Sequence, residues 1–148
     1  MYYNVYIIHY NTYVYYQNII CKGDNRKMTK KITVSEEEVT PIRRDPPRTS
    51  KILLTEMSVG ATSLAMGVNY TDVGSMIPDG VHDKDEAMFL VKGKINLVIE
   101  DKEEIIVNPN TAFFVKAGTK HRLENIGDEP FKIIWVYAPP LASHRIKK

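Results

Sequence analysis

The sequence predicts an all-β domain, a sandwich or barrel of short strands. Short apolar segments follow one another from Ser50 onward at spacings of about ten residues, which is typical of such folds. Gly, Pro, Asn and Asp separate these segments, and no segment keeps a helical periodicity of apolar residues. With 148 residues, 43% of them hydrophobic, the chain has the size and composition of one domain with one buried core.

The strands can be assigned in order along the chain. Ile95, Leu97 and Ile99 alternate with polar residues, which indicates a strand with one buried face, and the same alternation recurs from Phe131 to Tyr137. Turns are expected between the strands, among them Pro78-Asp79-Gly80. The predicted strands cover residues 50–59, 63–70, 87–91, 94–100, 104–107, 111–115, 121–125 and 131–137.

The segments that flank these strands differ from them in composition. Pro41, Pro46 and Pro47 oppose a helix, so residues 28–50 are expected to form an extended lead-in with at most one turn at residues 35–39. Residues 51–140 would form a single barrel, and residues 141–148, which include His144, a basic C-terminal tail.

The first 27 residues have an unusual composition. Seven of the nine tyrosines fall in the first sixteen residues, and the first charged residue is Lys22. Three interpretations are open: an extra strand, a disordered tail, or a translated leader that does not belong to the native protein. We favour the leader, because Tyr, Asn and Ile have codons rich in A and T. Lys22-Gly23-Asp24 can also be encoded by a purine-rich run like a bacterial ribosome-binding site, shortly before Met28.

The leader hypothesis predicts an AT-rich prokaryotic source and a native protein that begins at Met28. The intact mass of the protein made from its native gene tests it. A species that begins at Met1 would contradict it.

Composition excludes several classes of partner. The net charge of +2 comes from 20 Lys and Arg against 18 Asp and Glu, and this excess lies within the first 27 residues. Without a clustered basic patch, no nucleic-acid partner is expected. No stretch is long and apolar enough to span a membrane, so no membrane partner is expected. The single cysteine, Cys21, cannot form an internal disulfide, and a cytoplasmic protein is expected.

Three residues, His82, Glu86 and His121, are the candidate functional group. Glu86 shares a strand face with Met88 and Leu90, which places its carboxylate at the rim of the predicted core. His82 has the same parity, and His121 begins a separate strand with an apolar residue two positions later. Two imidazoles and one carboxylate that converge inside a barrel suit a divalent transition metal.

At these residues the sequence resembles the cupin superfamily. The first family motif reads G-x5-H-x-H-x3-E-x6-G and the second G-x5-P-x-G-x2-H-x3-N. Three positions depart from them: Gly80 replaces the first histidine, Asn110 a glycine and Lys116 the proline. The positions that match are Gly74, His82, Glu86, Gly93, Gly118, His121 and Asn125.

The resemblance implies a double-stranded β-helix, or jelly-roll barrel, over about residues 57–140, and a metal site. In the family, the two histidines and the glutamate of the first motif and the histidine of the second hold Fe, Mn, Zn or a similar ion; Ni is a further candidate here. Carried over, this leaves His82, Glu86 and His121 as ligands, because Gly80 has no side chain to offer. Because one family ligand is missing at position 80, a weakly bound metal and the absence of a metal are also open. Small cupins commonly form dimers, so a homodimer is implied.

The predicted pocket is almost wholly apolar. No Arg or Lys on the predicted strands is placed to bind a phosphate or carboxylate, which favours a small neutral or partly aromatic organic molecule. Dioxygenase, lyase and cyclase chemistry are each compatible, with Glu86 as a ligand and Tyr70 as a candidate acid. A metal-free sensor or accessory protein is the alternative. The expected pocket residues are Met88, Leu90, Phe113, Leu123, Ile133 and Trp135.

Overall fold

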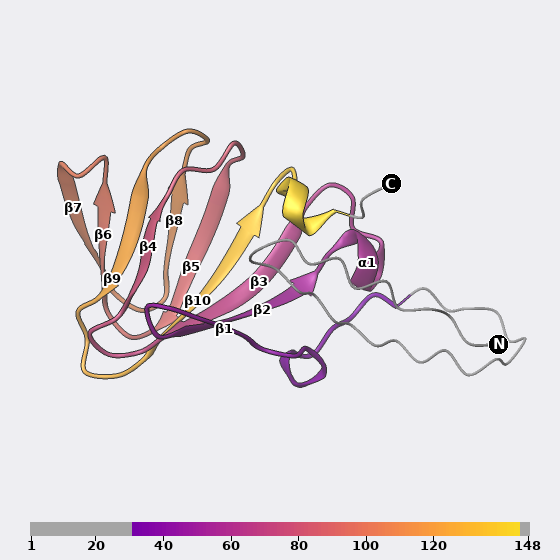
Figure 1. The fold of residues 1–148 in the computed structure, drawn as a ribbon, viewed down its shortest axis with the longest axis horizontal. Coiled ribbons are helices and arrows are strands. Elements are labelled where there is room, and N and C mark those ends of the chain that lie inside the picture. Colours follow the sequence, from indigo (N-terminus) through magenta and orange to yellow (C-terminus); the bar gives the residue numbers. More distant parts are fainter. Residues whose placement is uncertain (1–30, 146–148) are drawn as a thin grey trace, which may run out of the picture.

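A computed structural model describes residues 31–145, which form two antiparallel sheets (Figure 1). The six-stranded sheet has the order β1 (Ile42–Arg44), β2 (Arg48–Leu54), β3 (Ala65–Thr71), β10 (Phe131–Tyr137), β5 (Glu86–Lys92), β8 (Thr111–Val115). The four-stranded sheet has the order β4 (Met76–Gly80), β9 (His121–Asn125), β6 (Ile95–Ile99), β7 (Glu103–Val107). The all-β, jelly-roll prediction is confirmed.

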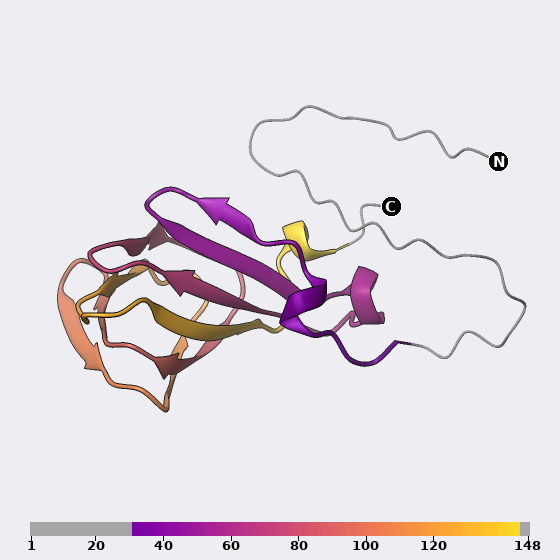
Figure 2. The same cartoon turned by 90° about the horizontal axis from the view of Figure 1, so that it is seen from below.

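One apolar core lies between the two sheets, which face each other in Figure 2. Side chains alternate between the faces of a strand, so residues of one parity on each strand enter this core. Leu90, Ile95 and Ile133 have no exposed surface there. The alternating apolar residues 95, 97 and 99 and the six predicted pocket residues all belong to this cluster or pack against it: Ile95, Leu97, Ile99, Met88, Leu90, Phe113, Leu123, Ile133 and Trp135.

The sequence analysis placed three segments incorrectly. Residues 56–59 form the short helix α1 (Glu56–Val59) rather than the end of a strand, because Thr55 and Ser58 make a reciprocal capping box and Gly60, at φ 72°, ends the helix. The predicted turn Pro78-Asp79-Gly80 instead forms the second half of β4, which pairs with β9. The sheet also begins before residue 51, since β1 pairs with Arg48–Ser50 inside the predicted lead-in.

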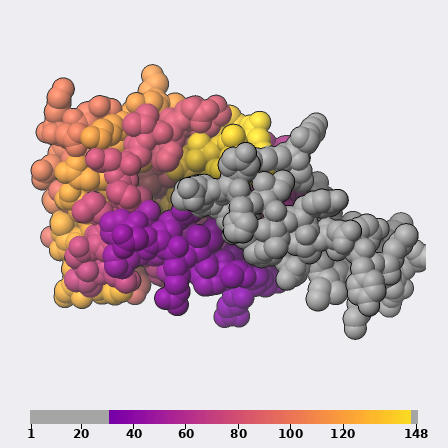
Figure 3. Space-filling view, in the orientation of Figure 1, coloured from indigo at the N-terminus to yellow at the C-terminus, as the bar shows by residue number. Residues whose placement is uncertain are grey.

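The N-terminal part of the described chain covers the outer face of the six-stranded sheet over β2 and β3. A single 3-10 turn, η1 (Glu36–Glu38), lies where one turn was expected. Val39 packs with Leu53 and Val68 in a second, smaller apolar cluster. Tyr70 belongs to this outer face, where its hydroxyl donates a hydrogen bond to Glu36 (2.6 Å). In the space-filling view, the indigo and purple segment around β1 forms the surface beside the barrel strands (Figure 3).

The chain ends are only partly described. The predicted leader, residues 1–27, lies outside the described residues. Ala142–His144 forms a 3-10 turn, η2, and Leu141 before it packs against the main core. Within residues 31–145, no helix is long and apolar enough to cross a membrane.

Candidate metal centre

Three neighbouring strand ends bring the candidate ligands together at one end of the barrel. Glu86 is the first residue of β5 and lies opposite Tyr137 on β10. His121 is the first residue of β9 and lies opposite Gly80, the last residue of β4. His82 follows β4 by two residues, and its carbonyl accepts a hydrogen bond from the Gly118 N–H (2.7 Å). Gly118 has φ 81°, a conformation that favours glycine, so this turn fixes the His82 loop against the start of β9.

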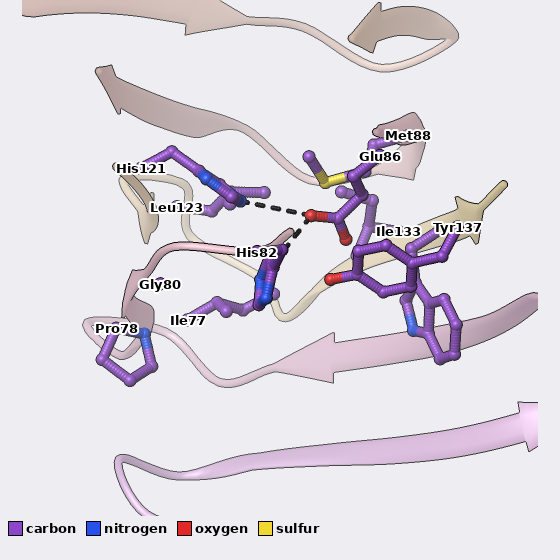
Figure 4. Close-up of a pocket in the computed structure, with 11 residues that line it drawn as sticks. Ile77, Pro78, Gly80, His82, Glu86, Met88, His121, Leu123, Ile133 and Tyr137 are labelled. Atoms are coloured by element: carbon purple, nitrogen blue, oxygen red, sulfur yellow. Dashed lines mark hydrogen bonds and ion pairs between the residues drawn. The ribbon is translucent and has the colours of Figure 1, made fainter. Parts of the chain in front are cut away.

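The ligand atoms of His82, Glu86 and His121 lie within 4.8 Å of one another. Glu86 Oε2 is 3.2 Å from His121 Nε2 and 3.9 Å from His82 Nε2. Glu86 and His121 are buried and His82 is half-buried. Figure 4 shows both imidazoles and the Tyr137 ring grouped around the Glu86 carboxylate. The sequence spacing therefore identified three side chains that do meet in space.

His121 is held by oxygen atoms at both ring nitrogens. Nδ1 lies 3.0 Å from the Thr119 carbonyl, and Nε2 lies 3.2 Å from Glu86. Burial by itself lowers the pKa of His121, but the hydrogen bonds to Glu86 and Thr119 outweigh it and raise the pKa above its usual range. The Thr119 carbonyl fixes the proton on Nδ1, so Nε2 is the nitrogen directed at the site.

The pKa of His82 is shifted in the opposite direction to that of His121. Burial lowers its pKa, the Glu86 carboxylate partly offsets this, and the neighbouring His121 lowers it further. Its ring lies edge-on to both His121 and Tyr137, with centroids 5.5 and 5.3 Å away. A neutral imidazole in this position has a lone pair free to bind a metal ion.

A chamber of about 420 Å³ is lined by His82 and Glu86, and a narrower niche of about 50 Å³ at its inner end is lined by all three candidate ligands. Trp135 and Tyr137 from β10 and Ile77 and Pro78 from β4 line both spaces. Burial raises the pKa of the Tyr137 hydroxyl, and the neighbouring Glu86 adds to this effect, so Tyr137 keeps its proton.

The niche includes four of the six predicted pocket residues. Met88, Leu123, Ile133 and Trp135 line it. Leu90 is fully buried deeper in the core, and Phe113 packs against the core without lining either space. Tyr70 is not brought to the site, because its parity on β3 places it on the outer face of the sheet.

Sequence reasoning missed three charged or titratable residues of the chamber. His144, assigned to the basic tail, stacks on Trp135 with ring centroids 5.2 Å apart, and its buried Nδ1 has no hydrogen-bond partner among the described residues. Arg44 and Arg48, assigned to the lead-in, also line the chamber. In the structure Leu141 packs against the main core and the tail folds back, but nothing in the sequence of the tail indicates this.

The polar residues around the motifs mostly have structural partners. Lys120 and Arg122, which flank His121, form ion pairs with Asp79 and Asp101. Asn125 stabilises the following turn: its amide donates to three carbonyl groups, and its oxygen accepts from the Gly127 N–H.

The fold and the site together define a small jelly-roll barrel with a candidate metal centre at one end. A family model described as a cupin domain matches residues 70–137. The tetracenomycin polyketide synthase protein TcmJ of Streptomyces glaucescens is 31% identical over 107 residues, which cover 72% of this chain and 70% of that protein. The chain therefore belongs to the cupin superfamily.

Two further similarities agree with this assignment. The polyketide synthase CurC of Streptomyces cyaneus is 28% identical over 90 residues, which cover 60% of this chain and 58% of that protein. The structure of the polyketide cyclase RemF from Streptomyces resistomycificus superposes with a TM-score of 0.66 at 17% identity, covering 76% of this chain and 82% of that one. At that identity the superposition shows the shared fold.

Proposed function

We propose that this chain is a divalent-metal cupin enzyme that acts on a small, largely aromatic organic molecule by cyclase-type chemistry. The observation that carries the proposal is the convergence of His82, Glu86 and His121 at the inner end of a chamber lined by Trp135 and Tyr137.

The donor set fits a divalent transition metal. Two imidazoles and one carboxylate are the ligand composition of three-ligand sites that leave coordination positions open for substrate or water. The Thr119 carbonyl orients His121, which is how metal-ligating histidines are usually held. An ion held by His82, Glu86 and His121 would supply a Lewis acid that polarises a substrate oxygen.

The chamber supports an aromatic substrate. Its volume lies within the usual range for small-molecule sites of about 300–1,000 Å³. The aromatic rings of Trp135, Tyr137 and His144 line the chamber, and Tyr137 keeps its proton. Among the three chemistries open from sequence, the named polyketide synthase and cyclase relatives favour ring closure over dioxygenase or lyase chemistry.

Metal analysis of protein purified without an affinity tag tests the metal centre. The wild type, incubated with iron, manganese, zinc or nickel and desalted, is expected to retain close to one ion per chain. His121→Ala should lose it. His144→Gln is the matched control, because it removes an imidazole from the same chamber but not from the ligand set, and it should keep the ion. A metal content that is the same in His121→Ala and in the wild type would place the site elsewhere.

A metal-free ligand-binding protein is the second candidate. Two observations favour it: position 80 carries no imidazole, and Glu86 and His121 already satisfy each other by a hydrogen bond. If none of the four metals is retained while an aromatic ligand still binds, the protein is a sensor or accessory protein rather than a metalloenzyme.

A homodimer and a cytoplasmic location complete the proposal. The dimer is supported by exposed apolar side chains on the six-stranded sheet, Phe89 and Phe114. Fractionation of the source cells tests the location.

A further inference from the structure

We propose that Ser50 and Asn69 form a polar subsite in the wall of the chamber, where the Ser50 hydroxyl donates a hydrogen bond to a carbonyl oxygen of the ligand. The ligand would then be a neutral polycyclic aromatic ketone. The subsite itself does not depend on the metal centre. Only the extension of the ligand toward His82, Glu86 and His121 rests on the function proposed above.

Two buried polar side chains interrupt the inner face of β2 and β3. Ser50 and Asn69 are direct cross-strand partners, and directly opposed residues of an antiparallel pair project to the same side. They are 8% and 5% exposed, and both line the chamber. Ile52, the next residue of β2 on this face, belongs to the apolar core. Polar groups are costly to bury, so a polar pair at this place indicates a role in ligand recognition.

The hydrogen bonds of this pair run in one direction. The Thr71 hydroxyl donates to the Asn69 oxygen (2.8 Å), and the Asn69 amide donates to Ser50 Oγ (2.8 Å). Thr71 has no exposed surface and does not line the chamber, so its hydroxyl hydrogen needs an acceptor inside the protein. Because the Asn69 oxygen is that acceptor, the amide nitrogen of Asn69 is the atom turned toward Ser50.

The Ser50 hydroxyl is the end of this chain of hydrogen bonds. A serine hydroxyl carries one donor hydrogen, and Ser50 Oγ already accepts from Asn69, so the hydrogen must point elsewhere. Within residues 31–145, no acceptor takes it. Since Ser50 lines the chamber, this donor is available to a ligand oxygen, and an oxygen that accepts it removes the penalty of an unpaired buried donor.

The subsite and the metal centre lie far apart in the same chamber. In the sheet order β2, β3, β10, β5, three strand spacings separate Ser50 from Glu86, which is roughly 14 Å. Trp135 and Tyr137 lie on β10, between these strands, and line the chamber. A single ring does not reach both ends, whereas a fused ring system with an oxygen at each end does. The chamber therefore favours a polycyclic aromatic ketone.

Calorimetric titration with α-tetralone and its hydrocarbon analogue tetralin tests the subsite in protein freed of metal with EDTA. The two ligands share their ring skeleton and differ in the carbonyl oxygen, so the ratio of their affinities reports the hydrogen bond rather than ring packing. In Ser50→Ala the tetralone-to-tetralin ratio should fall about tenfold from its wild-type value. Thr49→Val is the matched control: it removes a hydroxyl from the neighbouring residue, which has the other parity on β2, and it should leave the ratio unchanged.

Thr71→Val tests the direction of the hydrogen bonds. Without the Thr71 hydroxyl, the Asn69 amide is free to turn its oxygen toward the Ser50 hydrogen, which then no longer points at the ligand. The affinity ratio should therefore fall in this variant too, although Thr71 does not line the chamber. An unchanged tetralin affinity would show that the chamber keeps its shape.

A ratio that is the same in Ser50→Ala and in the wild type would overturn the inference, because the carbonyl would then bind another donor, such as the Tyr137 hydroxyl. So would a metal-free wild type that does not bind tetralone. Thermal unfolding checks that each variant folds, and Thr71→Val carries the test if Ser50→Ala does not. Because no metal is present, a fall of the ratio in a protein that also retains no metal would support the subsite and contradict the metal centre.

Discussion

The protonation of His121 has a direct consequence for metal binding. Both ring nitrogens face oxygen acceptors, so the residue favours the doubly protonated imidazolium, and its pKa is raised. A metal ion that binds Nε2 must displace one proton. The pKa of His82 is lowered, so this ligand loses its proton at a lower pH than His121 does.

We therefore predict that metal affinity rises with pH by roughly tenfold per unit until the pH exceeds the raised pKa of His121, and then levels off. Affinity rises with pH because the loss of the His121 proton removes the competitor for Nε2. The raised pKa of His121 keeps that proton bound to higher pH. Calorimetry with Zn²⁺ in buffers of different ionisation enthalpy measures both the affinity and the released proton. An affinity that stays constant from acidic to neutral pH would show that His121 does not bind the ion.

Gly80 lies where the family motif has a ligand, and its Cα–H points at the site. A Cβ at this position would lie 3.1 Å from His82 Nε2, so the imidazole would have to move by a few tenths of an ångström. We predict that Gly80→Ala weakens metal binding about tenfold, by analogy with other changes that disturb the orientation of a ligand.

Gly80→His carries the same Cβ and adds an imidazole, so Gly80→Ala is its matched control. The histidine variant should bind metal more tightly than the alanine variant. Equal affinity of the two variants would show that position 80 cannot supply a ligand in this barrel.

Much of the metal centre could be predicted from sequence because its three residues fall on motif spacings within regular strands. The rest of the chamber could not. His144, Arg44 and Arg48 reach it from a 3-10 turn and an edge hairpin, whose positions depend on tertiary contacts such as the packing of Leu141 on the core. No periodicity in those segments records the contact.

At the scale of the elements, alternation predicted the strands that have one buried face. The residues of β8, β9 and β10 agree with the predicted bounds. Alternation did not predict β4 or β1, because the residues there disfavour a strand. β4 contains Pro78 and Gly80, and β1 lies among prolines. Pairing with β9 and β2 overrides these propensities.

Asn125 connects the end of β9 to the end of β3. Its buried amide donates to the carbonyls of Thr71, Asp72 and Glu129. We predict that Asn125→Ala lowers the free energy of unfolding by about 3 kcal/mol, because these buried acceptors lose their partner. Urea denaturation measures the loss, and Asn108→Ala, at an exposed turn, should change stability by less than about 0.5 kcal/mol. A similar stability of both variants would contradict this role.

At the scale of the whole molecule, the outer face of the six-stranded sheet is apolar across several strands. The segment around Val39 covers it over β2 and β3. Farther along the sheet, Phe89 on β5 is 38% exposed and Phe114 on β8 is 61% exposed. The register places Phe114 opposite Ala87, next to Phe89, so the two rings lie on the same uncovered part of the face.

A second copy of the chain that packs on this uncovered part would bury both rings, so we predict a homodimer that depends on them. Phe114→Glu should convert the dimer to a monomer in sedimentation or light-scattering measurements, because a carboxylate at the centre of an apolar interface loses its hydration. Val73→Glu, which adds the same charge at an exposed apolar residue of the β3–β4 loop, should leave the dimer intact. A wild type that is monomeric at high concentration would refute the dimer. A Phe114→Glu variant that remains dimeric would instead place the interface on another surface, such as the edge of β2 beyond Ser50, where its ladder with β1 ends.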